Sequence, residues 1–386
     1  MEVLFVSHKY PPAVGGMEKQ SFELITGMER HCKVHRIVLD GNESTLSYFL
    51  LLKQRILRTC ANNPGIRIIH FNDGLIAAFC SRHKGYGQLK RTATLHGLDV
   101  VFPSKIYHRF ILPRFNRFDK LIAVSNATAR EAQRLGIDQN KLVVIPNGVD
   151  TSGETASATG SIRELLADHG IAYNDERILV ALGRPVRRKG MSWFIENVVP
   201  RLKGDFLLLL IGAYEASPGR IEKLLARLPK RIAEKISLFL GFPTDNAPLR
   251  QLLEKPDIAA RVRHLRKLPT NEVQMLLSHS AAFIMPNIKV KGDMEGFGLV
   301  CLEAAIAGAT VFAANIDGIP DAIQDGKNGY LLPSGDAKAW AARLNEVIEN
   351  EPLEEDKPVF RQYTIENCGW EKMVRGYFEV FQSLIK

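Results

Sequence analysis

The chain has 386 residues, of which 46% are hydrophobic and 24% charged, a balance typical of a folded globular protein with room for two domains. It has no run of 18 apolar residues, and its start lacks a basic segment followed by an apolar one, so the sequence predicts neither a membrane span nor a signal peptide. The five cysteines are scattered without a Cys-x-x-Cys pair, which argues against a disulfide framework or a zinc site and favours a reducing, cytoplasmic compartment.

The net charge of +9 comes entirely from the first part of the chain. Residues 1–150 contain 21 Lys and Arg against 12 Asp and Glu, whereas the remaining residues are balanced. This asymmetry indicates either an anionic partner for the first half or a solvated basic face without a partner, and composition leaves both open.

In the first half, short apolar runs alternate with longer amphipathic stretches. The runs are almost continuously apolar, which is typical of parallel strands buried on both faces. Alternation of strands and helices predicts an open, doubly wound α/β sheet. The expected strands are Val3–Ser7, Val34–Leu39, Ile66–Phe71, Thr92–Leu95, Leu121–Ser125 and Leu142–Ile145, and the expected helices are Glu18–Arg30, Tyr48–Thr59 and Ala127–Leu135.

A small, polar segment at residues 151–161 reads as a linker, and the alternation restarts after it. The expected strands are Ile178–Leu182, Phe206–Ile211, Ile236–Leu240, Val262–Leu265, Ala282–Met285 and Thr310–Ala313, and the expected helices are Asn271–Ser278, Val300–Ala307 and Trp370–Leu384. We therefore expect a first domain at 1–150, a second at 162–368, and a C-terminal helix at 369–386 that packs back on the first domain. Two such halves predict a ligand in a cleft between the carboxyl ends of their sheets.

The strongest motif is Glu295–Ala304, in which a second carboxylate, Glu303, follows Glu295 across a glycine-rich turn. Glycines just before a helix leave backbone N–H groups free to meet an anion. Carboxylates accept hydrogen bonds from vicinal hydroxyls, so the pair suits a sugar and a ribose. Taken alone, such a turn is more often a helix cap than a binding site.

Three further segments follow predicted strands. Gly183–Gly190 carries Arg184 and Lys189, whose guanidinium fork and point charge suit a diphosphate. Pro11–Gly16 ends in adjacent glycines that permit close approach, but it is not a Gly-x-Gly-x-x-Gly fingerprint, which disfavours a dinucleotide-dependent dehydrogenase. Thr94–Asp99 places His96 where ligands bind. Taken alone, each has a plain alternative: a basic turn in solvent, an ordinary tight turn and a structural histidine.

Together and in this order, these segments resemble glycosyltransferase family 4. That family has the GT-B fold, an α/β architecture of two Rossmann-like, doubly wound domains facing each other across a cleft. The resemblance extends over nearly the whole chain. It is carried by Gly15–Glu18, His96–Asp99, Ala123–Thr128, Ile145–Asp150, Gly183–Arg184 with Lys189–Gly190, the Glu295–Ala304 segment, Gly318–Asp321 and Asp325–Leu332.

The resemblance implies a retaining, metal-independent, hexosyltransferase-like enzyme that uses a UDP- or GDP-sugar donor and no other cofactor. No two aspartates lie two positions apart, so the Asp-x-Asp motif of metal-dependent transferases is absent. Without a metal ion, protein groups must stabilise the leaving diphosphate. Same-face attack, in which the leaving phosphate helps to deprotonate the acceptor, is implied rather than a covalent carboxylate intermediate.

By resemblance, Arg184 and Lys189 hold the diphosphate, Glu295 contacts the donor sugar and Glu303 holds the ribose. The implied catalytic residues are His96, Glu295, Arg184 and Lys189. The implied donor-binding residues are Gly15, Gly16, Gly183, Arg184, Lys189, Glu295, Gly296, Phe297, Gly298, Leu299 and Glu303. Asp99 and Asp73 are acceptor-side candidates on the first domain, and no residue is assigned to a metal.

Some features depart from the family pattern. The stretch before Pro146 is short, residues 231–260 look like an insertion between strands, and Pro185 stands where an apolar residue is common. Two rival functions use the same fold: a sugar-nucleotide epimerase or hydrolase, which needs no acceptor, and a catalytically inactive binding protein.

Residues 82–120 hold nine basic and two acidic residues, and their core at 105–118 interleaves cations with aromatics. Such a segment fits an anionic membrane surface or a core-packing helix with a solvated basic rim. We expect a monomer that binds a nucleotide sugar and a glycan or lipid-linked acceptor for cell-surface polysaccharide, lipopolysaccharide or glycolipid synthesis. It would be cytoplasmic, peripheral on the inner face of the membrane if that surface is used, and would bind no nucleic acid.

Overall fold

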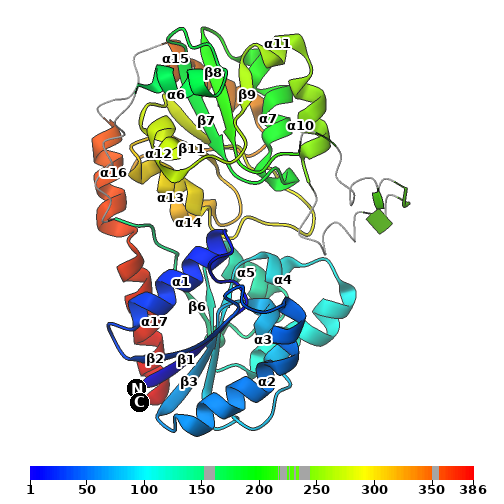
Figure 1. The fold of residues 1–386 in the computed structure, drawn as a ribbon, viewed down its shortest axis with the longest axis vertical. Helices are drawn as coiled ribbons and strands as arrows, with labels where there is room; N and C mark the ends of the chain where they lie inside the picture. Colours follow the sequence, from blue (N-terminus) through cyan, green and yellow to red (C-terminus); the bar gives the residue numbers. More distant parts are fainter. Residues whose placement is uncertain are drawn as a thin grey trace. The chain divides into compact units, whose positions relative to one another are not determined.

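The computed structural model describes residues 1–151, 161–215, 244–349 and 356–386, together with 217, 224, 225, 227–229, 232 and 233. The chain divides into two compact units, which are coloured along the sequence in Figure 1. Unit 1 comprises Met1–Val149 and Cys368–Lys386, and unit 2 comprises Asp150–Asn367. The expected linker lies almost wholly outside the described residues, which omit 152–160.

Unit 1 is built on a six-stranded parallel sheet with the order β2-β1-β3-β4-β5-β6. The strands are β1 (Glu2–Ser7), β2 (Lys33–Val38), β3 (Ile66–Phe71), β4 (Lys90–Leu95), β5 (Lys120–Ala123) and β6 (Leu142–Val144). The helices are α1 (Gly16–Met28), α2 (Thr45–Asn62), α3 (Gly74–Cys80), α4 (Leu98–Val101), α5 (Asn126–Arg134) and α17 (Trp370–Ile385), with short turns η1 (Tyr107–Ile111), η2 (Leu112–Arg117) and η3 (Gln139–Lys141).

Helices cover both faces of this sheet because successive side chains of a buried strand point to opposite sides. Leu4 and Val6 of β1 join the buried core beneath α2 and α3. On the other face, the Phe5 ring lies 6.1 Å from that of Phe381 on α17. Figure 1 shows α17 beside α1, so the last helix of the chain completes unit 1.

Unit 2 repeats the architecture with the strand order β12-β11-β10-β7-β8-β9, again all parallel. Its strands are β7 (Arg177–Leu182), β8 (Phe206–Ile211), β9 (Val262–His264), β10 (Ala282–Met285), β11 (Val311–Ala314) and β12 (Tyr330–Leu332). Its helices are α6 (Ile162–Asp168), α7 (Met191–Asn197), α10 (Asn246–Leu253), α11 (Pro256–Ala259), α12 (Thr270–Ser278), α13 (Leu299–Ile306), α14 (Ile319–Ala322), α15 (Ala337–Glu349) and α16 (Asp356–Asn367), with turns η4 (Arg187–Lys189) and η5 (Val199–Arg201).

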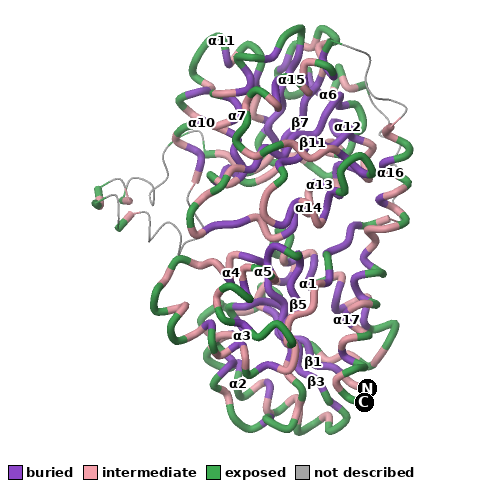
Figure 2. The backbone as a smooth tube through the Cα atoms, turned by 180° about the vertical axis from the view of Figure 1, so that it is seen from behind, coloured by how far each residue is buried: buried purple, intermediate pink, exposed green. Residues whose placement is uncertain are grey.

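The expected strands that fall on described residues are present, with ends that differ by at most two residues. The expected strand Ile236–Leu240 lies outside the described residues. Strand β12 was not expected as a strand. The suspected insertion at 231–260 is described at residues 232 and 233 and from Thr244 onward, where it forms α10 and α11. Figure 2 shows the strands as the buried centre of each unit.

Candidate functional site

In unit 2, most of the predicted donor residues lie at the point where the strand order reverses. β7 pairs directly with β10, and the connections from these two strands run to opposite sides of the sheet. Open α/β sheets bind ligands outside the carboxyl ends of the strands at such a switch point. The segments that leave these two ends, residues 183–190 and 286–298, therefore form the candidate site.

Gly190 brings the basic turn η4 against the segment after β10. It has a left-handed conformation, with φ of 66°, and a Cβ built there would lie 2.1 Å from the carbonyl oxygen of Pro286. Only glycine meets both conditions without strain. The backbone N–H of Ile288 also donates to the carbonyl of Arg188 at 3.0 Å. The backbone thus holds the cations of η4 beside the loop that carries Glu295.

Glu295 is the centre of a buried ion cluster. Its Oε2 lies 2.9 Å from Lys189 Nζ and 3.4 Å from Arg188 Nε, and it accepts a hydrogen bond from Asn287 Nδ2 at 3.3 Å. Arg188 also pairs with Asp293 at 3.2 Å. Two cations therefore share two carboxylates, and the Lys189 side chain is only 9% exposed.

The cluster changes the pKa values of its two carboxylates in opposite directions. Burial alone would raise the pKa of Glu295, but Lys189 and Arg188 outweigh it and lower that pKa to about 2. Burial raises the pKa of Asp293 in spite of its pairing with Arg188. Glu295 is therefore ionised throughout the neutral range and can only accept hydrogen bonds.

A second layer of contacts fixes the Glu295 backbone. Asp317 accepts a hydrogen bond from the Glu295 N–H at 3.1 Å and pairs with Lys289 at 2.9 Å. Asp317 has φ of 52°, a conformation uncommon for a residue other than glycine. Strain of this kind persists where surrounding contacts determine it and is frequent at functional sites.

The glycine-rich turn leads into α13 as the sequence predicted. Gly298 adopts a left-handed conformation immediately before the helix, and Phe297 is buried. The Cys301 N–H donates to the carbonyl of Gly298 at 2.9 Å, which leaves the N–H groups at the start of the turn, beginning at Leu299, to meet an anion. Glu303 lies half-buried one turn into α13.

Arg184 and Gly183 lie at the exposed edge of the site. Gly183 follows β7, and Lys189 Cε lies 3.5 Å from the position that its Cβ would occupy. Arg184 is exposed, and its side chain forms no hydrogen bond or ion pair with any residue in the described part of the chain. It is therefore a cation that can turn to a ligand without breaking an existing pair.

In unit 1, the two acceptor-side candidates already make structural hydrogen bonds. Asp73 follows β3 and caps α3 by accepting from the Ile76 N–H at 2.9 Å. Its other oxygen accepts from His8 Nδ1, also at 2.9 Å. Burial would raise its pKa, but His8 and the capping N–H hold the pKa of Asp73 below its usual value.

Asp99 and His96, which follow β4, are joined by hydrogen bonds from the His96 backbone N–H to the Asp99 carboxylate. Asp99 accepts from the backbone N–H groups of His96, Gly97 and Gly74 at 2.9–3.1 Å, while burial raises its pKa. The His96 ring donates from Nε2 to the carbonyl of Asn72 at 2.8 Å. The catalytic role of His96 and the acceptor roles of Asp73 and Asp99 stay predictions, as does donor binding by Gly15 and Gly16 at the start of α1.

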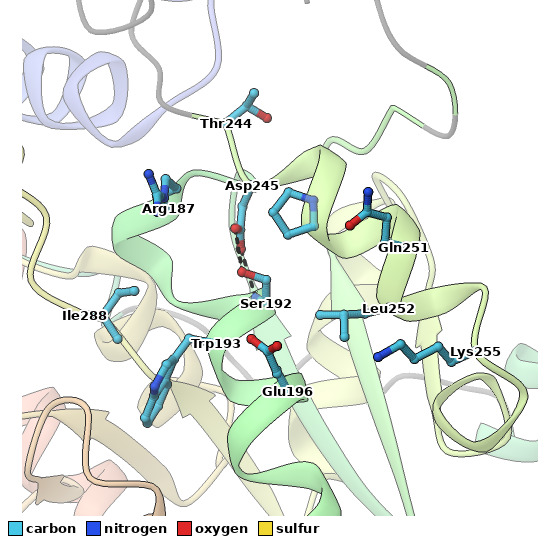
Figure 3. A pocket seen from close by; sticks show the side chains of 11 residues that line it. Arg187, Ser192, Trp193, Glu196, Thr244, Asp245, Gln251, Leu252, Lys255 and Ile288 are labelled. Atoms are coloured by element: carbon cyan, nitrogen blue, oxygen red, sulfur yellow. Dashed lines mark hydrogen bonds between the residues drawn. The ribbon is translucent and has the colours of Figure 1, made fainter. Parts of the chain in front are cut away.

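A separate cavity of about 550 Å³ lies between η4, α7 and α10 of unit 2 (Figure 3). Its walls include Arg187, Trp193 and Lys255 but none of the predicted donor residues. Its buried acid, Asp245, accepts hydrogen bonds from the backbone and the hydroxyl of Ser192, at 2.9 and 2.6 Å. Asp245 therefore serves to hold the start of α7.

Sequence reasoning missed several members of the network. Arg188 stands beside Lys189 in the same basic turn, which was a usable signal, whereas Asp293 lies two positions before the Glu295–Ala304 motif. Asn287 and Asp317 had none, because only the folded chain brings them to Glu295. His8 directly follows the first strand, which was a usable signal. In the described part of the chain, no group of three or more His, Cys, Asp or Glu could hold a metal ion.

Comparison with protein families gives two matches that together span most of the chain. The family described as Glycosyltransferase Family 4 matches residues 2–152, and that described as Glycosyl transferases group 1 matches residues 163–364.

Among curated proteins, the chain is 26% identical over 275 residues to alpha-maltose-1-phosphate synthase of Mycolicibacterium smegmatis, with 69% of this chain and 63% of that protein covered. It is 28% identical over 209 residues to D-inositol 3-phosphate glycosyltransferase of Corynebacterium urealyticum, with 53% and 45% covered. It is 24% identical over 334 residues to N-acetyl-alpha-D-glucosaminyl L-malate synthase of Bacillus anthracis, with 84% and 77% covered. The chain thus spans less than two thirds of the length of the first two.

Among solved structures, HepE of Anabaena in complex with UDP has a TM-score of 0.71 at 18% identity, with 99% of this chain and 100% of that chain covered. Sucrose-phosphate synthase of Thermosynechococcus elongatus has a TM-score of 0.70 at 17% identity, with 100% and 99% covered. At these identities the likeness shows the fold alone, which is GT-B as expected. None of the described helices combines the length and apolar character needed to cross a bilayer.

Proposed function

Because the chain belongs to glycosyltransferase family 4, a family of retaining enzymes, we propose that it transfers the sugar of a UDP-sugar to a glycan or lipid-linked acceptor. The observation that carries the donor assignment is the buried Lys189–Glu295–Arg188 cluster at the switch point of unit 2. UDP is preferred over GDP because HepE, which shares the fold, was solved with UDP and with UDP-glucose.

The donor diphosphate would lie between the basic turn and the start of α13. Arg184 offers a guanidinium fork without an existing partner in the described chain, and Lys189 adds a point charge. The free N–H groups at Gly298 and Leu299 would meet the phosphate oxygens. These groups would stabilise the negative charge that grows on the diphosphate as the bond to the sugar breaks.

The two carboxylates would hold hydroxyl groups of the donor. Glu295 is ionised and fixed by Lys189, Arg188 and Asn287, so its remaining acceptor capacity can orient sugar hydroxyls. Glu303, on the next turn of α13, would hold the ribose. Retention follows if the acceptor attacks from the face that the diphosphate leaves, with a phosphate oxygen taking the acceptor proton.

A thermal-shift panel would test the donor site. Wild-type protein and Glu303→Ala would be heated with UDP-glucose, UDP-galactose, UDP-N-acetylglucosamine and GDP-mannose in the presence of EDTA. A ligand that binds only the folded protein adds about 2.7 kcal/mol at a hundredfold excess over its dissociation constant. We expect a shift with UDP-sugars that persists in EDTA and falls in Glu303→Ala.

A shift with GDP-mannose alone would replace the UDP assignment. A shift with no nucleotide sugar from a protein that unfolds cooperatively would contradict the proposed donor site, and a shift abolished by EDTA would contradict metal independence.

The acceptor would bind unit 1, and the basic character of residues 1–150 favours an anionic or membrane-held acceptor at the inner face of a membrane. In segment 105–118, for which a membrane surface and a core-packing helix were both open, Lys105, Ile106 and Phe110 are exposed, while Leu112 and Phe115 are buried. Supplying a labelled UDP-sugar and a membrane fraction should place label in the solvent-extractable lipid pool. Label found only in a water-soluble product would contradict a lipid-linked acceptor.

A further inference from the structure

Helix α2 presents apolar side chains to solvent on the side opposite its buried face. Tyr48, Leu52 and Ile56 are fully buried against the sheet. On the other side, Leu46 and Leu50 are 71% and 73% exposed, and Lys53 continues the same stripe at helical spacing. A helix that only covers a sheet normally carries polar residues on this side.

Helix α3 adds a second apolar stripe beside the first. Leu75 and Phe79, four residues apart, are 57% and 45% exposed. The Phe79 ring meets that of Phe49 on α2 edge to face, with centroids 5.1 Å apart. The two helices are therefore neighbours, and Figure 2 shows exposed positions along both.

Basic residues predominate around these stripes, and an acid just before α2, Glu43, is paired with Arg55. Arg82 and Lys84 are exposed on the loop after α3, which packs on α2 because Leu57 lies 2.6 Å from the Cβ position of Gly85. Residues 45–84 contain six Lys and Arg and a single acid, Asp73, which is buried. We name the set Leu46, Leu50, Lys53, Leu75, Phe79, Arg82 and Lys84 the α2–α3 surface.

We propose that the α2–α3 surface docks on an anionic lipid bilayer. Leu50 and Phe79 would enter the acyl boundary while the cations, Lys53 among them, pair with lipid phosphates. A second copy of the chain is disfavoured because its cations would face those of the first. The proposal rests on the proposed function in that a surface-bound transferase meets a lipid-linked acceptor directly.

Vesicle flotation would test this surface on the full chain. Vesicles of equal parts phosphatidylglycerol and phosphatidylcholine would be compared with pure phosphatidylcholine at low and at high salt. Leu50→Glu/Phe79→Glu removes the apolar part, and Lys53→Gln/Arg82→Gln/Lys84→Gln removes the charge. Val359→Glu alters an equally exposed apolar residue, at 63%, on α16 of unit 2 and is the matched control.

We expect wild type and Val359→Glu to float with the anionic vesicles at low salt and not with phosphatidylcholine. Each Lys or Arg near an anionic surface contributes about fivefold to binding, so the triple charge variant should bind about a hundredfold more weakly. The double apolar variant should lose binding at both salt concentrations, since acyl contacts are not screened.

The proposal is overturned if wild type does not float at low salt, or if the double variant floats as wild type does. It is also overturned if the double variant abolishes a concentration-dependent dimer in sedimentation while vesicle binding is unchanged. The UDP-sugar thermal shift, measured on the same proteins without vesicles, confirms that the variants are folded. The side chains that carry that shift, Arg184, Lys189, Glu295 and Glu303, are not part of the α2–α3 surface, so failure of docking leaves the donor assignment standing.

Discussion

At the level of single residues, Glu295 combines a structural and a chemical role. Its carboxylate compensates the buried cation Lys189 and the partly buried Arg188, and it precedes a turn whose N–H groups can meet an anion. Removing one partner of a buried ion pair is costly because the other is left uncompensated. The residue that would orient the donor therefore also holds the empty site together.

Replacing Glu295 by Gln should destabilise the protein at neutral pH by about 3 kcal/mol, because Lys189 and Arg188 would remain buried without their main counter-charge. Chemical denaturation of the two proteins measures the difference. Glu346→Gln is the control: that carboxylate is 56% exposed and, among the described residues, pairs with Arg343 alone, so its loss should change stability by less than about 0.5 kcal/mol. A Glu295→Gln effect as small as the control's would contradict the cluster.

The same pair of proteins makes a pH prediction. The pKa of Glu295 is lowered from 4.5 to about 2 in the folded state, so its contribution is complete above pH 4.5 and is lost as pH falls through 2. Wild type and Glu295→Gln should therefore converge in unfolding free energy between pH 4.5 and 2. A difference that stays constant over this range would show that the carboxylate is not held ionised.

Much of this residue-level picture could be predicted. Glu295, Lys189 and Glu303 follow strand ends or open a helix, so their motifs already place them where ligands bind. The pairing of Lys189 with Glu295 across more than a hundred positions needs the β7–β10 pair. The contact between Asp317 and Glu295 could not be predicted either, because it depends on a left-handed backbone conformation that no sequence motif indicates.

At the level of elements, α17 is held on unit 1 by a buried polar chain. His70 on β3 hydrogen-bonds to Thr92 and Thr94, at 2.8 and 3.0 Å. The Thr94 hydroxyl also hydrogen-bonds to the Tyr377 hydroxyl on α17 at 2.9 Å. The same Tyr377 hydroxyl accepts a hydrogen bond from the Gln20 amide on α1 at 3.3 Å. Burial lowers the pKa of His70 to about 3, so the imidazole stays neutral within this chain.

Tyr377→Phe should cost about 1–3 kcal/mol of stability, because Thr94 and Gln20 would lose a buried partner that no solvent replaces. Thermal unfolding measures the loss. Tyr363→Phe on α16 serves as control, since that ring is only half-buried. If the two variants behaved alike, the buried chain would not be what holds α17.

Most strand positions were predictable because most strands of the two sheets are apolar runs of ordinary length. β12 was not predicted: like β6 it has three residues, all half-buried, but it begins directly after Gly329, which reads as a turn. The role of segment 105–118 was ambiguous in the sequence because its aromatic side chains lie in two environments: Phe115 and Phe118 are buried in the core, and Phe110 is exposed to solvent. A run of alternating basic and aromatic residues does not predict which of its aromatic rings will be buried in the folded protein.

For the whole molecule, two hydrophobic cores in two units predict unfolding that is not a single two-state transition. Calorimetry should resolve two components, or a calorimetric enthalpy larger than the van't Hoff value. UDP should raise the unfolding temperature of the same component whose unfolding temperature Glu295→Gln lowers, because the Glu295 cluster lies in unit 2. If UDP and Glu295→Gln affected different components, the donor would not bind at the Glu295 cluster.

The most direct test of the donor site compares two exposed arginines of the segment 183–190, Arg184 and Arg187, by calorimetric titration with UDP in EDTA. Neither side chain pairs with Glu295 in the described structure, so neither substitution removes the buried cluster. We predict that Arg184→Ala weakens UDP binding by tenfold or more, as expected for about 1.5–3 kcal/mol from a charged hydrogen bond, and that Arg187→Ala leaves it within about threefold. Equal binding by wild type and Arg184→Ala, or an equal loss in both variants, would contradict the account.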